Sequence, residues 1–250
     1  MNFAIPCLTD TSINLQASYQ VAINENPANQ RSTAAARKKR AAGNHAHFWA
    51  PGRTLRIAFV SGDQAFKDAV IAAASAWQPH INLLLEFVEG SAGEIRISST
   101  PGVYWSAIGT NALLIEEGPT MHLSPDLHAP AIFAASVLHE FGHALGAEHE
   151  HLHPESNIPW NKAAVYAAHG VAADADEDDY ARRAVDERYF NLLDASQFDY
   201  SPYDPQSIMH YPVRQDWTLG DFRIDLNRVL SEKDKAFMAK AYPHPVAQSA

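Results

Sequence analysis

Apolar and polar residues alternate over several short segments in the first half of the chain. The clearest segment is residues 54–60, which read Thr-Leu-Arg-Ile-Ala-Phe-Val. Successive side chains of a strand point to opposite faces, so this period of two residues predicts a β-strand. We predict four further strands, at residues 83–88, 94–98, 104–108 and 120–123.

A helical period follows the first strand. Between Ala65 and Trp77 the apolar side chains recur at helical spacing, which places them on one face of an α-helix. A second long helix is predicted from the apolar run 131–138, which has good helix formers and no breaker. Strands interleaved with two long helices favour the α+β class, with a mixed sheet and helices packed against it.

The pattern changes after residue 149, where histidines, prolines and a tryptophan mark irregular structure. We predict shorter helices at residues 162–169 and 180–193, and a last helix at 232–242 with Ser231 as its N-cap. No internal repeat and no low-complexity linker is present. We therefore expect one domain in two lobes, an upper lobe to about residue 149 and a lower lobe after it.

The second long helix leads into the motif H-E-x-x-H-x-x-G-x-x-H, which begins at His139. On a helix, His139 and His143 lie one turn apart on one face, where two imidazoles can hold a zinc ion. Glu140 is rotated by about 100° from His139, so it can stand beside the metal as a base for a bound water. Gly146 permits the left-handed turn that ends the helix, and His149 can supply a third ligand. Three protein ligands leave one position open, which is typical of catalytic zinc.

Other histidines near the motif are alternative ligands. His151 and His153 also follow the glycine closely, but the spacing favours His149, so His153 is expected outside the ligand set. His122 and His128 precede the helix, and we interpret them as ordinary polar positions rather than residues of the cleft. The alternative for the whole motif is a buried helix with histidines at its polar edge, which the five-point spacing disfavours.

Composition narrows the class of protein further. The 19 basic and 29 acidic residues give a net charge of −10 at pH 7, so nucleic acid is not expected as a partner. No run of 18 apolar residues occurs, and no membrane span is expected. The first ten residues show no Sec signal peptide. We expect export by another route or after trimming of a signal, with a cytoplasmic location as the alternative.

Residues 1–46 are rich in Ala, Asn, Gln and Ser and show no strong period. We interpret them as an N-terminal arm that leads into a catalytic domain, residues 47–250. The alternative is a pro-segment, with the basic run 37–40 as its cleavage point and Cys7 as a thiolate that blocks the zinc. Cys7 is the only cysteine, so no internal disulfide can form. The acidic run 174–179 is interpreted as a solvated loop, because it lacks the ligand spacing of a calcium loop.

A second motif, Ser207-Ile208-Met209-His210-Tyr211, lies downstream. Together with the extended zinc motif it resembles the metzincin metallopeptidases, and it is closest to the astacin branch. The resemblance covers residues 49–243 in scattered blocks, and the two motif regions are its specific parts. Other pieces that agree with astacins are Glu150 after the third histidine, Trp105-Ser106 with Gly109, and Leu230-Ser231-x-x-Asp234 with Tyr242.

The resemblance implies roles for the residues of the first motif. His139, His143 and His149 would bind one zinc ion, and Glu140 would act as general base and then as proton donor. Tyr211 would be an additional zinc ligand at rest that swings to stabilise the tetrahedral intermediate. The alternative for Tyr211 is a structural hydroxyl.

The resemblance also implies a metzincin-like fold. It comprises a twisted mixed five-stranded sheet with two long helices in the upper lobe, and an irregular lower lobe with the Met-turn and the C-terminal helix. Met209 would form a hydrophobic floor under the zinc, although plain core packing also explains a methionine there. The edge strand at Trp105, Ser106 and Ala107 would pair with an extended peptide substrate.

The chain departs from the astacin pattern at several positions. Astacins usually carry disulfides, and the residues after their third histidine include a glutamine and an arginine. Here those residues are His151, Leu152 and His153. The aspartate motif of the typical pro-segment is not recognisable, although Asp10 is a candidate. These departures argue against activation by a new N-terminus that pairs with Glu150.

These observations predict a zinc-dependent endopeptidase that acts on a protein or peptide as a monomer. One alternative is a zinc-bearing binding or toxin-like module without relevant peptidase activity. Glu140 argues against it, because a pure binding site has no use for a base there. A second alternative is a zinc hydrolase that acts on a non-peptide bond.

Overall fold

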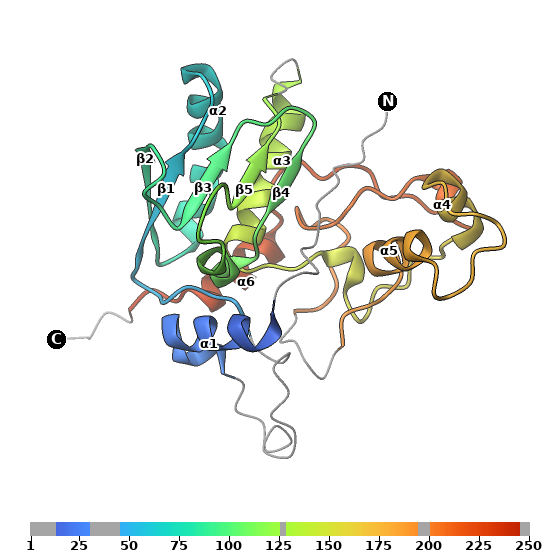
Figure 1. The fold of residues 1–250 in the computed structure, drawn as a ribbon. Helices are drawn as coiled ribbons and strands as arrows, with labels where there is room; N and C mark the ends of the chain where they lie inside the picture. Colours follow the sequence, from blue (N-terminus) through green and yellow to red (C-terminus); the bar gives the residue numbers. More distant parts are fainter. Residues whose placement is uncertain (1–13, 31–45, 126–128, 195–200, 246–250) are drawn as a thin grey trace. The chain divides into compact units, whose positions relative to one another are not determined.

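The computed structural model describes residues 14–30, 46–125, 129–194 and 201–245 (Figure 1). The chain forms two compact units, of which the first comprises Met1–Glu148 with Arg228–Ala250 and the second His149–Asn227. The helix near the C-terminus, which we expected in the lower lobe, therefore groups with the first unit. Four sequence features lie outside the described residues, namely Cys7, Asp10, the basic run 37–40 and His128.

A five-stranded mixed sheet forms the body of the first unit, as predicted. Its strands are β1 (Thr54–Phe59), β2 (Leu84–Glu89), β3 (Ile95–Ser98), β4 (Tyr104–Ser106) and β5 (Met121–Leu123). The order is β2-β1-β3-β5-β4, with all pairs parallel except β4–β5. In β1, Leu55 and Ile57 are buried while Thr54 and Arg56 are exposed, as the alternating pattern requires. β4 forms one edge of the sheet.

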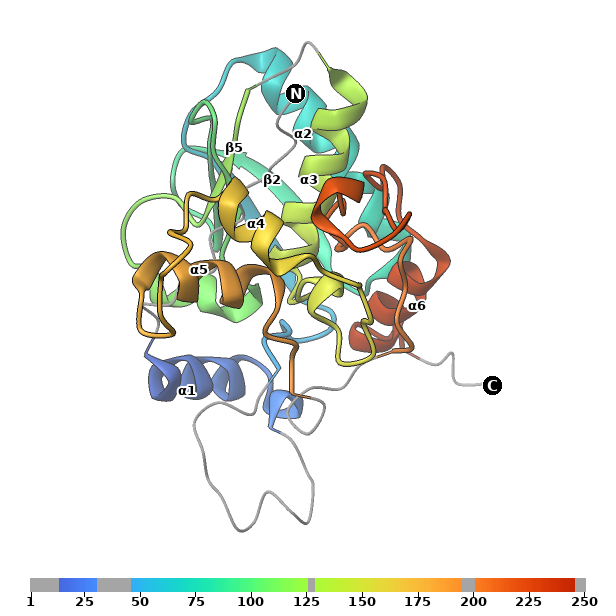
Figure 2. The ribbon, with the colours of Figure 1, turned by 90° about the vertical axis from the view of Figure 1, so that its right-hand side faces the viewer.

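Two helices, α2 (Gln64–Ala74) and α3 (Pro130–Ala144), lie side by side on one face of the sheet (Figures 1 and 2). Phe66 of α2 packs against Phe133 of α3, with ring centroids 5.8 Å apart. Helix α2 is shorter than predicted, because the chain tightens into a 3-10 turn after Ala74. Pro79 lies in this turn and has no N–H to continue an α-helical hydrogen-bond ladder.

The last helix, α6 (Glu232–Ala241), begins at the predicted N-cap. Ser231 Oγ accepts a hydrogen bond from the Asp234 N–H at 3.0 Å, and the Asp234 carboxylate accepts one from the Ser231 N–H at 2.8 Å. This reciprocal capping box satisfies two backbone donors at the start of the helix. The chain then reaches Tyr242, whose side chain is fully buried.

Part of the N-terminal arm is built into the first unit. Helix α1 (Leu15–Glu25) is followed by the 3-10 turn η1 (Pro27–Asn29). Ser18 of α1 and Asn111 form a buried hydrogen bond of 2.6 Å between their side chains. Asn29 holds the backbone of Phe48 from both sides, since its Nδ2 donates to the Phe48 carbonyl at 2.8 Å and its Oδ1 accepts from the Phe48 N–H at 3.0 Å.

The second unit has little regular structure, as expected. It contains α4 (Lys162–Ala168), α5 (Tyr180–Tyr189) and the 3-10 turns η4 (Glu150–Leu152) and η5 (Gln215–Trp217). Its interior is aromatic, with the Tyr189 ring centroid 5.8 Å from Trp160 and 5.6 Å from Trp217.

Helix α5 ends four residues before the predicted end. The N–H groups of Phe190 and Asn191 both donate to the Asp186 carbonyl, which closes the last turn. The Leu193 N–H then donates to the Leu152 carbonyl at 2.7 Å, so the chain has left the helix. The acidic run 174–179 before α5 forms turns, and Asp179 caps the helix. None of the described helices is long and apolar enough to cross a membrane.

We predict that Asn29→Ala lowers the free energy of unfolding by about 1–3 kcal/mol, because it leaves half-buried polar backbone groups of Phe48 without their partner. Urea denaturation measures this loss. Asn24→Ala is the matched control, because Asn24 is exposed on the same arm and its replacement should change stability little. Equal losses for both variants would contradict the idea that Asn29 fastens the arm.

Candidate active site

Helix α3 carries the first three residues of the zinc motif. His139, Glu140 and His143 are all buried, with exposed fractions of 3, 0 and 1%. The preceding turns of the helix are apolar and pack into the first unit, so the helix is held firmly where it presents these side chains. A buried carboxylate costs free energy unless a cation or hydrogen bonds compensate it. A divalent cation beside Glu140 would provide that compensation.

The helix ends in a Schellman turn at Gly146. The Gly146 N–H donates to the His143 carbonyl at 2.8 Å, and the Ala147 N–H donates to the Gly142 carbonyl at 2.9 Å. Gly146 has a φ of +96°, which favours glycine strongly. A Cβ at this position would also lie 2.9 Å from a ring carbon of Phe48. Both observations explain why the motif has glycine here.

Two aromatic side chains cap the carbonyl end of α3. The indole Nε1 of Trp49 donates to the Ala144 carbonyl at 2.8 Å, and the Tyr242 hydroxyl donates to the Leu145 carbonyl at 2.6 Å. Trp49 and Tyr242 are both fully buried, and burial raises the pKa of the Tyr242 hydroxyl. The phenol therefore stays protonated and can donate at any ordinary pH. These caps are not predictable from the sequence pattern, because each donor lies far along the chain from its acceptor.

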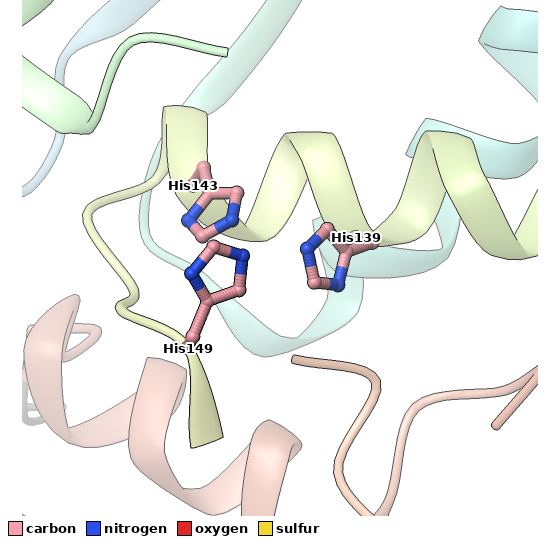
Figure 3. A group of neighbouring side chains, drawn as sticks. All are labelled: His139, His143 and His149. Atoms are coloured by element: carbon pink, nitrogen blue, oxygen red, sulfur yellow. The ribbon is translucent and has the colours of Figure 1, made fainter. Parts of the chain in front are cut away.

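The three predicted zinc ligands meet at this end of the helix. The ligand atoms of His139, His143 and His149 lie within 4.8 Å of one another, and all three side chains are buried. Figure 3 shows two rings on α3 and the third on the segment after the turn, grouped around a shared space. Nδ1 of His143 lies 2.8 Å from the Ala147 carbonyl oxygen, so this nitrogen carries the proton and Nε2 keeps a lone pair for a metal.

Three imidazoles within this distance fit a zinc ion, which prefers nitrogen and sulfur ligands and tetrahedral geometry. The alternative ligands point elsewhere. Nε2 of His151 lies 2.7 Å from the Arg188 carbonyl oxygen, and Nε2 of His153 lies 2.7 Å from that of Ser201. His122 lies on β5, with its Nδ1 3.3 Å from Thr100 Oγ1. In the part of the chain that the structure describes, the triad is the only three-residue group that could hold a metal.

The second motif forms a buried turn within the second unit. Ser207 Oγ accepts from the Met209 N–H at 3.0 Å, and the side chain of Asn227 donates to the Ser207 carbonyl at 2.8 Å. The Met209 side chain is 4% exposed. Glu150 fastens the turn twice, since its N–H donates to the Met209 carbonyl at 3.1 Å and its carboxylate accepts from the Asp204 N–H at 2.6 Å.

Tyr211 lies at the end of this turn among aromatic rings. Its ring centroid is 4.4 Å from that of His149, tilted by 55°, and 4.4 Å from that of His151, nearly parallel at 15°. Burial lowers the pKa of His210 to about 4, so this imidazole is neutral. Its Nδ1 donates to the Tyr211 carbonyl at 2.6 Å, and its Nε2 accepts from the Tyr203 hydroxyl at 2.8 Å. The sequence pattern gave no signal for this contact between His210 and Tyr203.

No family model and no curated protein matches this chain. Solved structures do match it. A structure of myroilysin is 35% identical with a TM-score of 0.73, and the match covers 80% of this chain and 97% of that one. A second myroilysin structure is 36% identical with a TM-score of 0.60, over 79% and 86% of the two chains. High choriolytic enzyme 1, a hatching enzyme zinc-protease from the medaka fish Oryzias latipes, shares the fold at 20% identity and a TM-score of 0.53, over 78% and 94% of the chains.

The fold, the histidine triad and these matches together define a zinc metallopeptidase of the metzincin class. The chain belongs to the astacin-like family of zinc metalloendopeptidases, with myroilysin as a relative. It is therefore an enzyme that hydrolyses peptide bonds, and the alternative of a binding or toxin-like module without peptidase activity is not supported.

We predict that Gly146→Ala destabilises the protein by about 2–3 kcal/mol, because it combines a strained backbone with a clash against Phe48. Gly170→Ala is the control, because Gly170 also has a positive φ, of +72°, but its added Cβ would meet no atom within 4 Å. It should lose only about 1 kcal/mol. Urea unfolding with and without a chelator compares the two. Equal losses of stability in Gly146→Ala and Gly170→Ala would show that contact of the added Cβ with Phe48 does not contribute.

We predict that His149→Ala lowers zinc affinity by more than about 100-fold, since removal of a ligand should cost more than loss of a supporting contact. His153→Ala should keep wild-type affinity, because its Nε2 is engaged by the Ser201 carbonyl. Competition with a chromophoric chelator measures both constants. Loss of zinc from the His153 variant alone would reverse the ligand assignment.

Proposed function

We propose that this endopeptidase binds one zinc ion through His139, His143 and His149 and uses Glu140 as its general base. The observation that carries the proposal is the buried triad, with its ligand atoms within 4.8 Å. When bound, zinc would polarise the scissile carbonyl and lower the pKa of a water to about 7. Proton transfer, stabilisation of the oxyanion and substrate binding are proposed for residues of this chain.

Glu140 holds and moves the proton in this proposal. It follows His139 directly on α3, so it is rotated by about 100° from the ligand face and remains close to the metal position without ligating it. Its carboxylate takes the proton from the attacking water and later delivers a proton to the leaving amine. Complete burial of the side chain keeps bulk water away from this transfer.

Tyr211 is proposed to donate a hydrogen bond to the oxyanion of the tetrahedral intermediate. Its ring touches that of His149, which supports a position beside the metal. Met209 lies in the same turn and is proposed to form the apolar floor of the site. The bonds of Glu150 to the Asp204 and Met209 backbones support its role as the residue that fixes this turn.

The substrate is proposed to add a strand at β4. This strand is the last in the sheet order and has one partner, β5. The Ala107 N–H donates to the Thr120 carbonyl at 2.9 Å on the β5 side, which keeps the segment Trp105–Ala107 extended. A peptide can therefore bind through backbone hydrogen bonds along the other side, and side chains are needed only for selectivity.

The wider organisation of the enzyme is also proposed. We propose a monomer that is secreted or exported from the cell. Residues 1–46 are proposed to form an N-terminal arm that leads into the catalytic domain, and the alternative is a pro-segment with the basic run 37–40 as its cleavage point and Cys7 as the residue that blocks the zinc. The hydrogen bonds of Ser18 with Asn111 and of Asn29 with the Phe48 backbone support an arm that packs on its own domain.

We predict that Glu140→Gln retains zinc and lowers kcat by about 10²–10⁴-fold, because the proton acceptor is lost and the ligands are kept. Casein cleavage and metal analysis measure the two effects, and a chelator should abolish wild-type cleavage. Glu155→Gln is the control, because Glu155 is exposed, and it should retain full activity. Near wild-type cleavage by the Glu140 variant would refute the assignment.

A further inference from the structure

His151 stands where astacins usually have another residue, and the structure gives it two contacts. Its ring is fully buried and stacks on Tyr211, with centroids 4.4 Å apart and ring planes at 15°. Its Nε2 donates to the Arg188 carbonyl at 2.7 Å. Arg188 lies in the last turn of α5, where helix carbonyls need donors from outside the helix.

These two contacts require different properties of one side chain. Stacking requires a flat ring, and the bond to the Arg188 carbonyl requires an N–H donor at the edge of that ring. Histidine combines both. The carbonyl fixes the plane of the imidazole, and the imidazole in turn fixes the plane of the phenol. The Tyr211 ring thereby contacts both His149 and His151, at equal centroid distances of 4.4 Å, and the centroids of the two histidine rings are 5.2 Å apart.

We propose that His151 is a positioning residue for Tyr211. The inference rests on the proposed function, in which the Tyr211 hydroxyl stabilises the oxyanion. A parallel stack leaves the phenol free to move within its plane but resists tilting out of it. The hydroxyl therefore reaches the oxyanion already oriented, and a preorganised donor costs no rearrangement at the moment of reaction.

This role differs from that of the neighbouring histidine. The ring of His153 lies 5.8 Å from that of Tyr203, and its Nε2 is held by the Ser201 carbonyl. Both histidines are buried and both donate to a backbone carbonyl, but the stacking partner of only one is the proposed catalytic tyrosine. His153 is therefore a matched control for the general loss of a buried histidine.

The test is a double-mutant cycle on the zinc-loaded enzyme with a fluorogenic peptide. Tyr211→Phe should lower kcat by about 10²-fold, as loss of an oxyanion donor does. His151→Ala should lower kcat by about tenfold and leave KM and zinc content unchanged. In the Tyr211→Phe background, His151→Ala should change kcat less than twofold, because a positioning residue has no effect once its hydroxyl is gone.

Two further variants separate the contacts. His151→Phe keeps the stack but loses the donor to the Arg188 carbonyl, so its kcat should lie between those of His151→Ala and the wild type. His151→Gln keeps a donor without a flat ring and should resemble His151→Ala. His153→Ala should keep wild-type kcat. If His151→Ala fails to fold, the phenylalanine and glutamine variants provide the comparison.

The possible failures are distinct. A Tyr211→Phe enzyme with wild-type kcat would refute the proposed role of Tyr211, and the inference with it. A loss of about 10²-fold in kcat for Tyr211→Phe would leave the proposed function intact. Then wild-type kcat in His151→Ala, or an equal loss in both backgrounds, would overturn the inference alone.

Discussion

The geometry of this site depends on how the carbonyl end of α3 is satisfied. The turn at Gly146 ends the helix abruptly, so the Ala144 and Leu145 carbonyls have no partner in a further helical turn. Both lie in the interior, where a carbonyl without a donor costs about 1–3 kcal/mol. The Trp49 indole and the Tyr242 hydroxyl supply those donors. The chain can then turn at Gly146 and continue to His149.

This constraint connects the local motif to the closure of the whole first unit. Trp49 comes before the first strand, and Tyr242 follows the last helix. The Tyr242 hydroxyl also accepts from the Trp49 N–H at 3.3 Å, so the two caps support each other. The ends of the domain therefore meet at the point where the helix stops. This explains physically why α6 groups with the sheet of the first unit rather than with the irregular segment that precedes it in sequence.

Features set by local sequence were predictable. Alternation predicted the five strands, and Ser231 predicted the start of α6 through a capping interaction that spans three residues. The spacing of the zinc motif predicted which histidines meet, because one helical turn and one glycine turn are local geometry. Contacts between distant residues were not predictable. The Trp49 and Tyr242 caps and the stack of His151 on Tyr211 join segments that no spacing rule relates. The end of α5 was also missed, because it depends on the Leu152 carbonyl from outside the helix.

Glu150, the residue after the third histidine, holds the turn that carries Tyr211 within the second unit. In the astacin pattern, a new N-terminus would pair with Glu150 after cleavage. In this chain the Glu150 carboxylate already accepts the Asp204 N–H at 2.6 Å, and the Glu150 N–H donates to the Met209 carbonyl. These two bonds hold the turn that carries Tyr211 from within the second unit, because Glu150, Asp204 and Met209 all belong to it. The residue next to the third histidine therefore fixes the backbone of the turn whose tyrosine ring lies against that same histidine.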